Sequence, residues 1–353
     1  ALWVGPIQGG RHLDLVEESA KKIGEMPFDI HALGSPTEVM ERYLFPVLVD
    51  MVMMAKTNIP LDRPFHLFGA GHPMMFSLAV ALGCDLFDSA SYALYAKDDR
   101  YLTPRGTLRL QDIRYLPCSC PICRNNSARD LKDKVRRERI RLLTEHNLHI
   151  CMAEMDKIKQ AITDGTLWDL IEARARGHPS MLSALKELAK YRGVLEEHSP
   201  GFKGRGVFFY DYHTLSRPEI TRYNKRLLGN YGKTKDSLLL LKAPPTTPYR
   251  KDPQYRALLK GIPEEIQEGW DICFYDSPYG CIPASLSETY PLSQSQIAEP
   301  IDYETLRFTV EGIKEYLRSA RYGKIILLRG YDRLDVMVEE VVMDVTEETS
   351  SMI

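Results

Sequence analysis

Three closely spaced cysteines followed by a histidine constrain this 353-residue chain more than any other feature. Cys118, Cys120 and Cys123 lie in the run Cys-Ser-Cys-Pro-Ile-Cys, and His146 follows in a stretch that reads as a helix. Three thiolates and one imidazole are the donor set of a tetrahedral zinc site in which no position stays open for chemistry. The pattern therefore predicts one structural Zn²⁺ that fastens a loop to a helix.

The sequence leaves two alternatives to this ligand set open. Free cysteines are often buried in ordinary cores, so the three thiols can also be read as reduced core residues. His149 and Cys151 lie close to His146 in the sequence, and either of them rivals it as the fourth ligand.

Composition is that of an ordinary globular protein, 44% hydrophobic and 27% charged, and the length allows two or three domains. The net charge of −2 means that any nucleic-acid binding must come from a local basic patch. Seven cysteines, an odd number, indicate reduced thiols in a cytoplasmic protein rather than a disulfide framework. No apolar run is long enough to predict a membrane span.

Strands alternate with helices through residues 1–95. Short apolar runs at 2–4, 28–33, 65–68 and 86–89 are separated by stretches that read as helices, which is typical of βαβ units and a parallel sheet. Each run ends in a Gly-rich or polar loop, where α/β barrels and open α/β sheets carry their sites. Four such units are half of an eight-stranded barrel and would leave two sheet edges unpaired. We therefore expect a truncated, processed or split chain whose other half is missing or supplied by another chain.

The rest of the chain departs from this rhythm. Residues 96–195 carry the cysteines, closing helices and, at 124–141, eight Lys/Arg against three Asp/Glu. This basic run is either a solvated helix face or a phosphate-contacting patch. From about residue 200, strand-like runs split by Pro-rich loops predict two small α+β domains, at 196–270 and 271–345, and a tail at 346–353. The last stretch, 331–353, is acidic and reads as a frayed end.

Polar and glycine residues mark the ends of the predicted parallel strands. Asp88 follows the last strand, where a carboxylate can act as a nucleophile or a base, or simply cap a turn. Gln8 carries an amide suited to a base edge, and Gly34 and Gly69 allow backbone to approach a flat ligand. Phe68 can stack on such a ligand or belong to the core.

Basic side chains alternate with tyrosines just after Asp88. Such alternation at a catalytic edge suggests contacts to the phosphates and bases of a nucleic acid. The basic residues are Lys97, Arg100 and Arg105.

Together these segments resemble the archaeal tRNA-guanine transglycosylases of the archaeosine type. The matching segments are 5–9, 66–74, 83–89 and 116–123, with His146. The resemblance implies the C-terminal half of a TIM (β/α)8 barrel at 1–95, with a zinc-binding subdomain at 96–195. It further implies tRNA-binding α+β domains after residue 200 and a cytoplasmic enzyme that is often a homodimer.

The resemblance also implies a reaction, the exchange of guanine at position 15 of tRNA for 7-cyano-7-deazaguanine (preQ0) in archaeosine biosynthesis. Asp88 would attack the ribose C1′ and form a covalent glycosyl intermediate. The positions that match base-binding residues are Gln8, Gly34, Ser35, Phe68 and Gly69, and the matching zinc ligands are Cys118, Cys120, Cys123 and His146.

Three departures from the family pattern raise other possibilities. The N-terminal half-barrel, which would carry a second aspartate, and the PUA domain are absent, so the chain alone is expected to be inactive. The base-binding loop reads Gly34-Ser35-Pro36, and Pro36 has no N–H to donate. Rival hypotheses are a non-catalytic tRNA-binding subunit, a downstream archaeosine-forming enzyme with Cys281 as its candidate nucleophile, and a metal-stapled structural protein.

Overall fold

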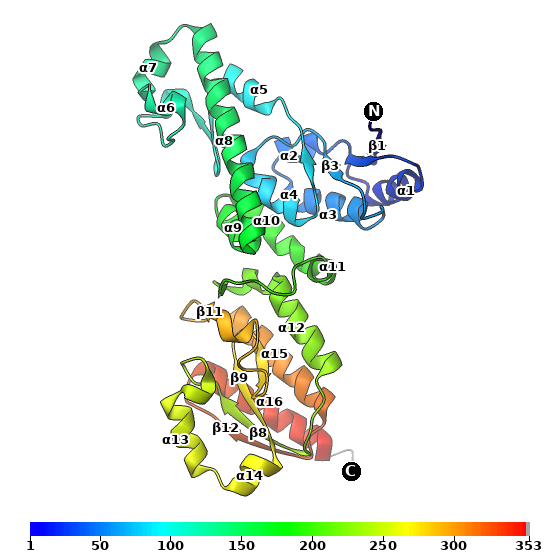
Figure 1. The fold of residues 1–353 in the computed structure, drawn as a ribbon, viewed down its shortest axis with the longest axis vertical. Helices are drawn as coiled ribbons and strands as arrows, with labels where there is room; N and C mark the ends of the chain where they lie inside the picture. The colour runs from blue at the N-terminus through cyan, green and yellow to red at the C-terminus, as the bar shows by residue number, and fades with distance from the viewer. Residues whose placement is uncertain (351–353) are drawn as a thin grey trace. The chain divides into compact units, whose positions relative to one another are not determined.

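The computed structural model describes residues 1–350, except for the side chains of residues 250 and 348–350. The chain divides into two compact units, with the boundary between Tyr191 and Arg192 (Figure 1). We call them unit 1 and unit 2. No helix in the described part of the chain combines the length and apolarity that crossing a membrane requires.

Unit 1 begins with four parallel strands that lie in the sheet in their sequence order, so the predicted βα alternation is confirmed. The strands are β1 (Val4–Ile7), β2 (Ile30–Leu33), β3 (Phe65–Leu67) and β4 (Leu86–Phe87). The helices between them are α1 (Leu13–Gly24), α2 (Thr37–Glu41), α3 (Phe45–Lys56) and α4 (Phe76–Ala81), the last preceded by the 3-10 turn η1 (Pro73–Met75). β1 and β4 are the two edges of this sheet.

The second part of unit 1 is a subdomain built along one long helix, α8 (Arg136–Asp164). The elements along α8 are α5 (Ser91–Lys97), the antiparallel hairpin β5 (Arg100–Thr103) and β6 (Gly106–Arg109), α6 (Pro121–Arg124), α7 (Ala128–Asp133) and α9 (Leu167–Ala175). α10 (Pro179–Glu187) follows and packs on α9 and α3. A small core around Tyr101, Leu110 and Leu143 holds the hairpin and α7 against α8. Gly165, with φ +71°, ends the helix in the left-handed conformation that favours glycine.

A buried ion pair joins α8 to α9, and its loss should destabilise unit 1. Both carboxylate oxygens of the fully buried Glu154 accept from Arg174, at 2.5 and 2.8 Å. Of the cations that the structure describes, Arg174→Met would leave the carboxylate with Lys157 alone, 3.9 Å away, and we expect the free energy of unfolding to fall by about 3 kcal/mol. Urea unfolding followed by fluorescence measures this. The double variant Glu154→Gln/Arg174→Met should lose less unfolding free energy than Arg174→Met, because it buries no unpaired charge. An equal loss in the two would mean that the unpaired carboxylate is not the cause.

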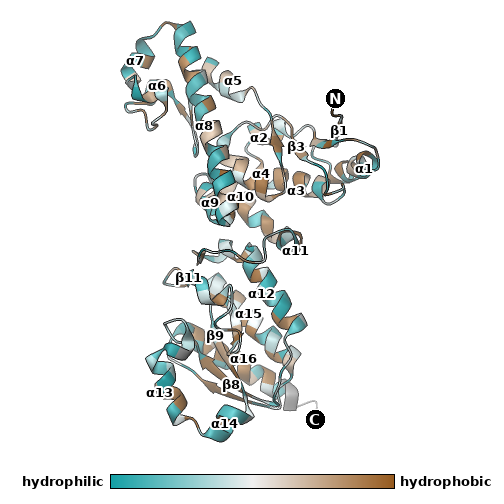
Figure 2. Ribbon diagram, viewed as in Figure 1, coloured by the Kyte–Doolittle hydropathy of each residue, from teal (hydrophilic) through white to brown (hydrophobic). Residues whose placement is uncertain are grey.

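Unit 2 is organised around one mixed sheet with strand order β10-β9-β8-β12. Its strands are β8 (Ser237–Lys242), β9 (Asp271–Asp276), β10 (Gly280–Pro283) and β12 (Lys324–Leu328), and a separate parallel pair joins β7 (Val207–Phe209) to β11 (Ser295–Ile297). The helices are α11 (Arg192–Glu197), α12 (Pro218–Asn230), α13 (Pro253–Gly261), α14 (Glu264–Gly269), α15 (Tyr303–Ala320) and α16 (Arg333–Ser350). Hydrophobic residues concentrate in the sheet, whereas α13 and α14 are largely hydrophilic (Figure 2).

The structure corrects two domain boundaries. The intervals 196–270 and 271–345 are not separate domains, because β8 pairs with both β9 and β12 in one sheet. The tail expected at 346–353 is helical as far as Ser350, within α16, and residues 351–353 lie outside the described part. Val338, Val341 and Val345 repeat at helical spacing on the buried side of α16, which explains why this helix packs against the core as far as Val345.

Candidate functional site

The predicted site residues of unit 1 gather at one edge of its sheet. Gln8 follows β1, Gly34 follows β2, Phe68 follows β3 and Asp88 follows β4. Because the four strands are parallel and adjacent, their carboxyl ends meet on the same side. The sequence correctly placed these residues at a common edge.

Asp88 is held through one of its two carboxylate oxygens. Oδ1 accepts from His66 Nε2 and from the Gly69 backbone N–H, both at 2.9 Å. Among the described residues, no donor reaches Oδ2, and the side chain is half exposed at a cavity of about 260 Å³. One oxygen is thus fixed and the other has no donor among the described residues, an arrangement that suits a nucleophile.

His66 is a site residue that reasoning from the sequence missed. It lies in β3 between the buried Phe65 and Leu67, so its side chain projects from the opposite face of the strand. Its ring lies 4.8 Å from the ring of Phe68, the next residue on the same face. Phe68 was already a predicted site residue. Since side chains two positions apart in a strand share a face, this alternation was the signal that could have added His66 to the site.

Glycine is required where the loops of this edge pass close to side chains. Gly69 has φ +70°, and a Cβ there would lie 2.7 Å from Thr37 Oγ1. A Cβ on Gly34 would lie 2.3 Å from Gln8 Nε2. Ser35, with φ +63°, donates from its hydroxyl to Gln8 Oε1 at 2.9 Å. Gln8 therefore contacts both residues of the 34–35 loop, whereas Gly69 contacts Asp88.

Two further features bear on base binding. Phe68 is 49% exposed, so it is available to a ligand rather than being a core residue. His72 lines the Asp88 cavity, and burial lowers its pKa to about 4, which keeps the ring neutral. Its Nδ1 accepts from the Met74 N–H, so Nε2 carries the proton, and no described residue accepts it. This buried N–H is therefore left without an acceptor in the described part of the chain.

The four predicted metal ligands come together in the subdomain. Their donor atoms all lie within 4.8 Å of one another, and His146 Nδ1 is 3.4 Å from both Cys120 Sγ and Cys123 Sγ. Cys120 immediately precedes α6, where Pro121 starts the helix, and His146 lies on α8. A site of this kind fastens α6 and its loop to α8, as the spacing predicted.

The surroundings of His146 prepare it as a ligand. Its Nε2 lies 3.1 Å from the Leu102 carbonyl, so Nε2 donates there and the Nδ1 lone pair faces the sulfurs. Burial lowers the pKa of His146 to about 4, and the ring of Tyr101 stacks on it at 3.7 Å. Burial raises the pKa of the Cys123 thiol to about 12, and a dication among the sulfurs would favour thiolates. The residues therefore fit a Zn²⁺ ion.

The two alternative ligands are excluded by position. His149 is exposed on α8. Cys151 directs its Sγ to the Gly71 carbonyl, 3.6 Å away, rather than to the cluster. All seven cysteines are free thiols, in agreement with the prediction that the chain has no disulfide framework.

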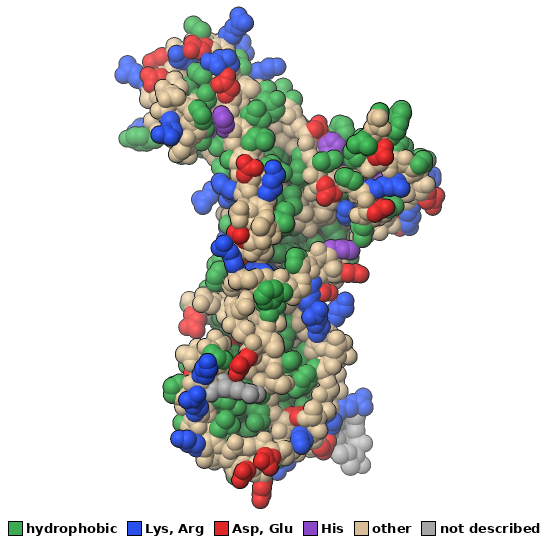
Figure 3. Space-filling model, viewed as in Figure 1, with side chains coloured by type: hydrophobic (Ala, Val, Ile, Leu, Met, Phe, Trp, Pro, Cys, Tyr) green, Lys and Arg blue, Asp and Glu red, His purple; other side chains and the backbone are tan. Residues whose placement is uncertain are grey.

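The residues expected to contact tRNA are spread over the start of the subdomain. Lys97 ends α5, and Arg105 lies in the turn between β5 and β6; both are exposed. Arg100 lies over the Tyr95 ring, with its Cζ 5.9 Å from the centroid. Figure 3 shows Lys and Arg side chains gathered around α7 and the start of α8, mixed with carboxylates. Part of the basic run is engaged internally, because Arg139 binds both carboxylate oxygens of Asp99.

Comparison with known proteins agrees with this combination of fold and sites. Residues 1–180 match the family queuine tRNA-ribosyltransferase, and residues 220–352 match a domain of unknown function (DUF5591). A tRNA-guanine(15) transglycosylase of Methanococcus vannielii is 40% identical over 89% of this chain and 47% of its own length. A protein of the same name from Methanocaldococcus jannaschii is 42% identical over 85% of this chain and 45% of its own length. Another, from Pyrobaculum aerophilum, is 41% identical over 89% of this chain and 63% of its own length.

Unit 1 thus defines an α/β protein with a carboxylate at the C-terminal edge of a parallel sheet and a Cys3His cluster in an attached subdomain. The chain belongs to the queuine tRNA-ribosyltransferase family, which has the TIM-barrel fold. It spans about half the length of the first of the curated relatives it matches.

Proposed function

We propose that this chain carries the nucleophile of a tRNA-guanine(15) transglycosylase that inserts preQ0 into tRNA. The observation that supports this most is the Asp88 carboxylate, which lines the cavity and is fixed through Oδ1 by His66 and Gly69, while Oδ2 has no donor among the described residues. Relatives that carry the name tRNA-guanine(15) transglycosylase match about nine-tenths of the chain.

The proposed reaction has two displacements at one carbon. Asp88 Oδ2 bonds to the ribose C1′ while the C1′–N9 bond to guanine breaks, and guanine leaves with the electron pair. PreQ0 then attacks C1′ through its ring nitrogen while the C1′–Oδ2 bond breaks and its electron pair returns to Asp88. The proton of that nitrogen passes to the group that protonated guanine in the first step. His66 and Gly69 hold the carboxylate in place in both steps, because their hydrogen bonds use only Oδ1.

The base would be held by the residues that surround the same edge. Phe68 offers an exposed ring for stacking, and the backbone at Gly34, Ser35 and Gly69 can approach a flat ligand. The Gln8 amide would bind the base edge after exchanging its bond to Ser35 for one to the ligand. Lys97, Arg100 and Arg105 would contact phosphates of the tRNA.

Zn²⁺ in this account is structural. Cys118, Cys120, Cys123 and His146 would hold it, and it would supply rigidity rather than a catalytic group, because four protein ligands close the coordination sphere. The proposed consequence for function is a fixed orientation of the β5–β6 hairpin and of Arg100 and Arg105 relative to α8.

We further propose that a separate half-barrel chain completes the site. β1 and β4 are edge strands, and each presents unpaired backbone groups to which further parallel strands can add. In this proposal the added half supplies the acid that protonates the leaving base.

The second candidate function is a tRNA-binding subunit without activity. It is favoured by the base-binding loop, where Ser35 and Gln8 bond to each other and Pro36 offers no N–H. The downstream archaeosine-forming enzyme finds little support in Cys281, which is fully buried in β10 and whose pKa is raised well above its ordinary value by burial.

Exchange of labelled guanine into tRNA separates the two candidates. The chain is assayed alone and together with the N-terminal half of one of the relatives named above. Incorporation that requires both chains would support the transglycosylase. Tight tRNA binding without incorporation in any combination would overturn it in favour of the non-catalytic subunit.

Removing the hydrogen bond from His66 should slow exchange without preventing tRNA binding. His66→Phe keeps the stacking partner of Phe68 but loses the donor to Asp88 Oδ1, and we expect the rate of exchange to fall about 100-fold. His66→Gln, which restores an N–H donor, should recover part of the rate, and tRNA affinity should change little in both. Equal exchange rates for His66→Phe and His66→Gln would mean that the hydrogen bond to Asp88 Oδ1 does not contribute to the reaction.

A further inference from the structure

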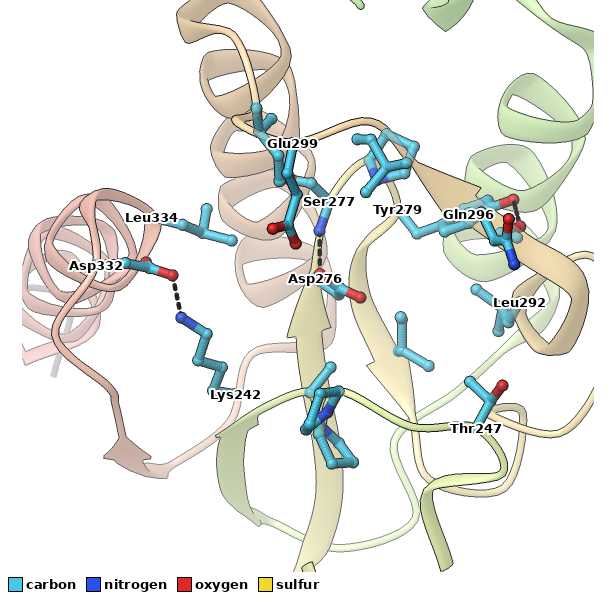
Figure 4. A pocket seen from close by; sticks show the side chains of 18 of the residues that line it. Lys242, Thr247, Asp276, Ser277, Tyr279, Leu292, Gln296, Glu299, Asp332 and Leu334 are labelled. Carbon is cyan, nitrogen blue, oxygen red and sulfur yellow. Dashed lines mark hydrogen bonds and ion pairs between the residues drawn. The ribbon is translucent and has the colours of Figure 1, made fainter. Parts of the chain in front are cut away.

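Unit 2 contains a cavity of about 1240 Å³ at the carboxyl ends of its parallel strands. Lys242 ends β8, Asp276 ends β9, and Asp332 follows β12 closely; all three line the cavity (Figure 4). In the sheet, β9 lies on one side of β8 and β12 lies on the other, so the direction in which strands are added reverses at β8. Such a switch in direction is where open α/β sheets bind ligands.

Among the described side chains, two basic ones line the cavity, and both already have partners. Lys242 Nζ forms ion pairs with Asp332 and, at 3.1 Å, with the buried Asp335. The guanidinium of Arg333 lies 4.5 Å from the centroid of the Tyr303 ring. The charge of Lys242 is therefore compensated within unit 2, whereas Arg333 keeps its charge and rests on an aromatic ring.

Two carboxylates of the cavity lack such compensation. Among the side chains that the structure describes, Asp276 and Glu299 form no ion pair. The hydrogen bond that Asp276 accepts comes from its neighbour, the Ser277 N–H, at 2.8 Å. Figure 4 shows the Glu299 carboxylate close to Asp276, with the Lys242–Asp332 pair to one side. Asp276 is partly buried whereas Glu299 is exposed, so the cost of a buried carboxylate without a cation falls on Asp276. Glu299 adds a second negative charge next to it, and this part of the cavity therefore favours a positively charged occupant.

The walls also suit an organic cation. Tyr249, Tyr255 and Tyr279 line the cavity together with Phe209. Aromatic faces attract ammonium groups, and they pack against a hydrocarbon chain. Phosphate or carboxylate ligands would instead meet two uncompensated negative charges.

We propose that this cavity of unit 2 is a binding site for a small organic amine, with Asp276 and Glu299 as the residues that receive its ammonium group. The site lies entirely within unit 2 and is independent of the reaction proposed at Asp88.

Binding should depend on pH in the direction set by Asp276. Burial raises the pKa of Asp276 to about 6, and the neighbouring Asp332 and Glu299 add to this rise while Lys242 opposes it. Arg333, at the start of α16, also lines the cavity. Below about pH 6 the carboxyl is neutral, so the amine should bind more weakly at pH 5 than at pH 7.5.

Titration calorimetry of the full chain with three probes tests the proposal. Pentylamine, pentan-1-ol and pentanoate differ in their head group and its charge. We expect pentylamine to bind best, and Asp276→Asn and Glu299→Gln each to weaken it about tenfold. Glu265→Gln, at an exposed position of α14, should leave its affinity unchanged.

Several results would overturn the site. They are absence of saturable pentylamine binding, equal binding of pentan-1-ol, tighter binding of pentanoate, and unchanged affinity in both cavity variants. A circular-dichroism spectrum checks that each variant is folded, and if Asp276→Asn misfolds, Glu299→Gln alone decides. Guanine exchange by the same samples reports separately on Asp88.

Discussion

Asp88→Asn is expected to lower the rate of guanine exchange by about 10³-fold or more. An amide is too weak a nucleophile to displace guanine, yet its carbonyl oxygen can still accept from His66 and Gly69. The change should therefore remove the chemistry while leaving the local geometry and the affinity for tRNA intact. Incorporation of labelled guanine, assayed with the complementing half-barrel, measures the loss.

Asp85 provides the matched control for this substitution. It lies three positions before Asp88, and its carboxylate accepts from the Phe65 backbone N–H at 2.8 Å, which ties β3 to the start of β4. Asp85→Asn keeps an acceptor for that bond and should retain most of the activity. Comparable losses in the two variants would mean that Asp88 acts through structure rather than as the nucleophile.

Loss of one metal ligand should have the largest effect on the stability of unit 1. Cys123→Ser removes a buried thiolate from the cluster, and we expect bound zinc to fall from about one per chain to nearly none. If the ion contributes at least about 3 kcal/mol, the midpoint of thermal unfolding should fall by about 10 °C, and chelation of the parent protein should have the same effect.

Cys151→Ser is the control for the metal. It lies on α8 like His146, but its Sγ points to the Gly71 carbonyl, so zinc content should stay near one per chain. Atomic emission of the purified proteins gives the stoichiometry. Full zinc content in Cys123→Ser, or equal loss in both variants, would overturn the assignment of the ligands.

The features that the sequence predicted well are those fixed by local spacing. The CxCxxC run has little freedom once Pro121 starts a helix, so its three sulfurs had to lie near one another. Residues that follow successive parallel strands necessarily share an edge, which is why Gln8, Gly34 and Asp88 could be grouped in advance.

The features that the sequence did not reveal depend on pairing between distant segments. The bond from His66 to Asp88 requires the register in which His66 lies opposite Leu86, and no local pattern states that register. Pairing of β8 with β9 and β12 likewise joins segments that Pro-rich loops made look like separate domains. In α16, by contrast, the sequence does contain apolar residues at helical spacing. The acidic residues between them led us to predict a tail instead of the end of a helix.

Trapping of a covalent adduct tests the central claim most directly. The chain is incubated with tRNA and a base analogue, with and without a candidate half-barrel, and then denatured and separated on a gel. We predict a denaturant-stable protein–tRNA adduct that requires Asp88 and the added half and is absent in Asp88→Asn. Tight tRNA binding without an adduct under any condition, or an adduct that persists in Asp88→Asn, would contradict the assignment of Asp88 as the nucleophile.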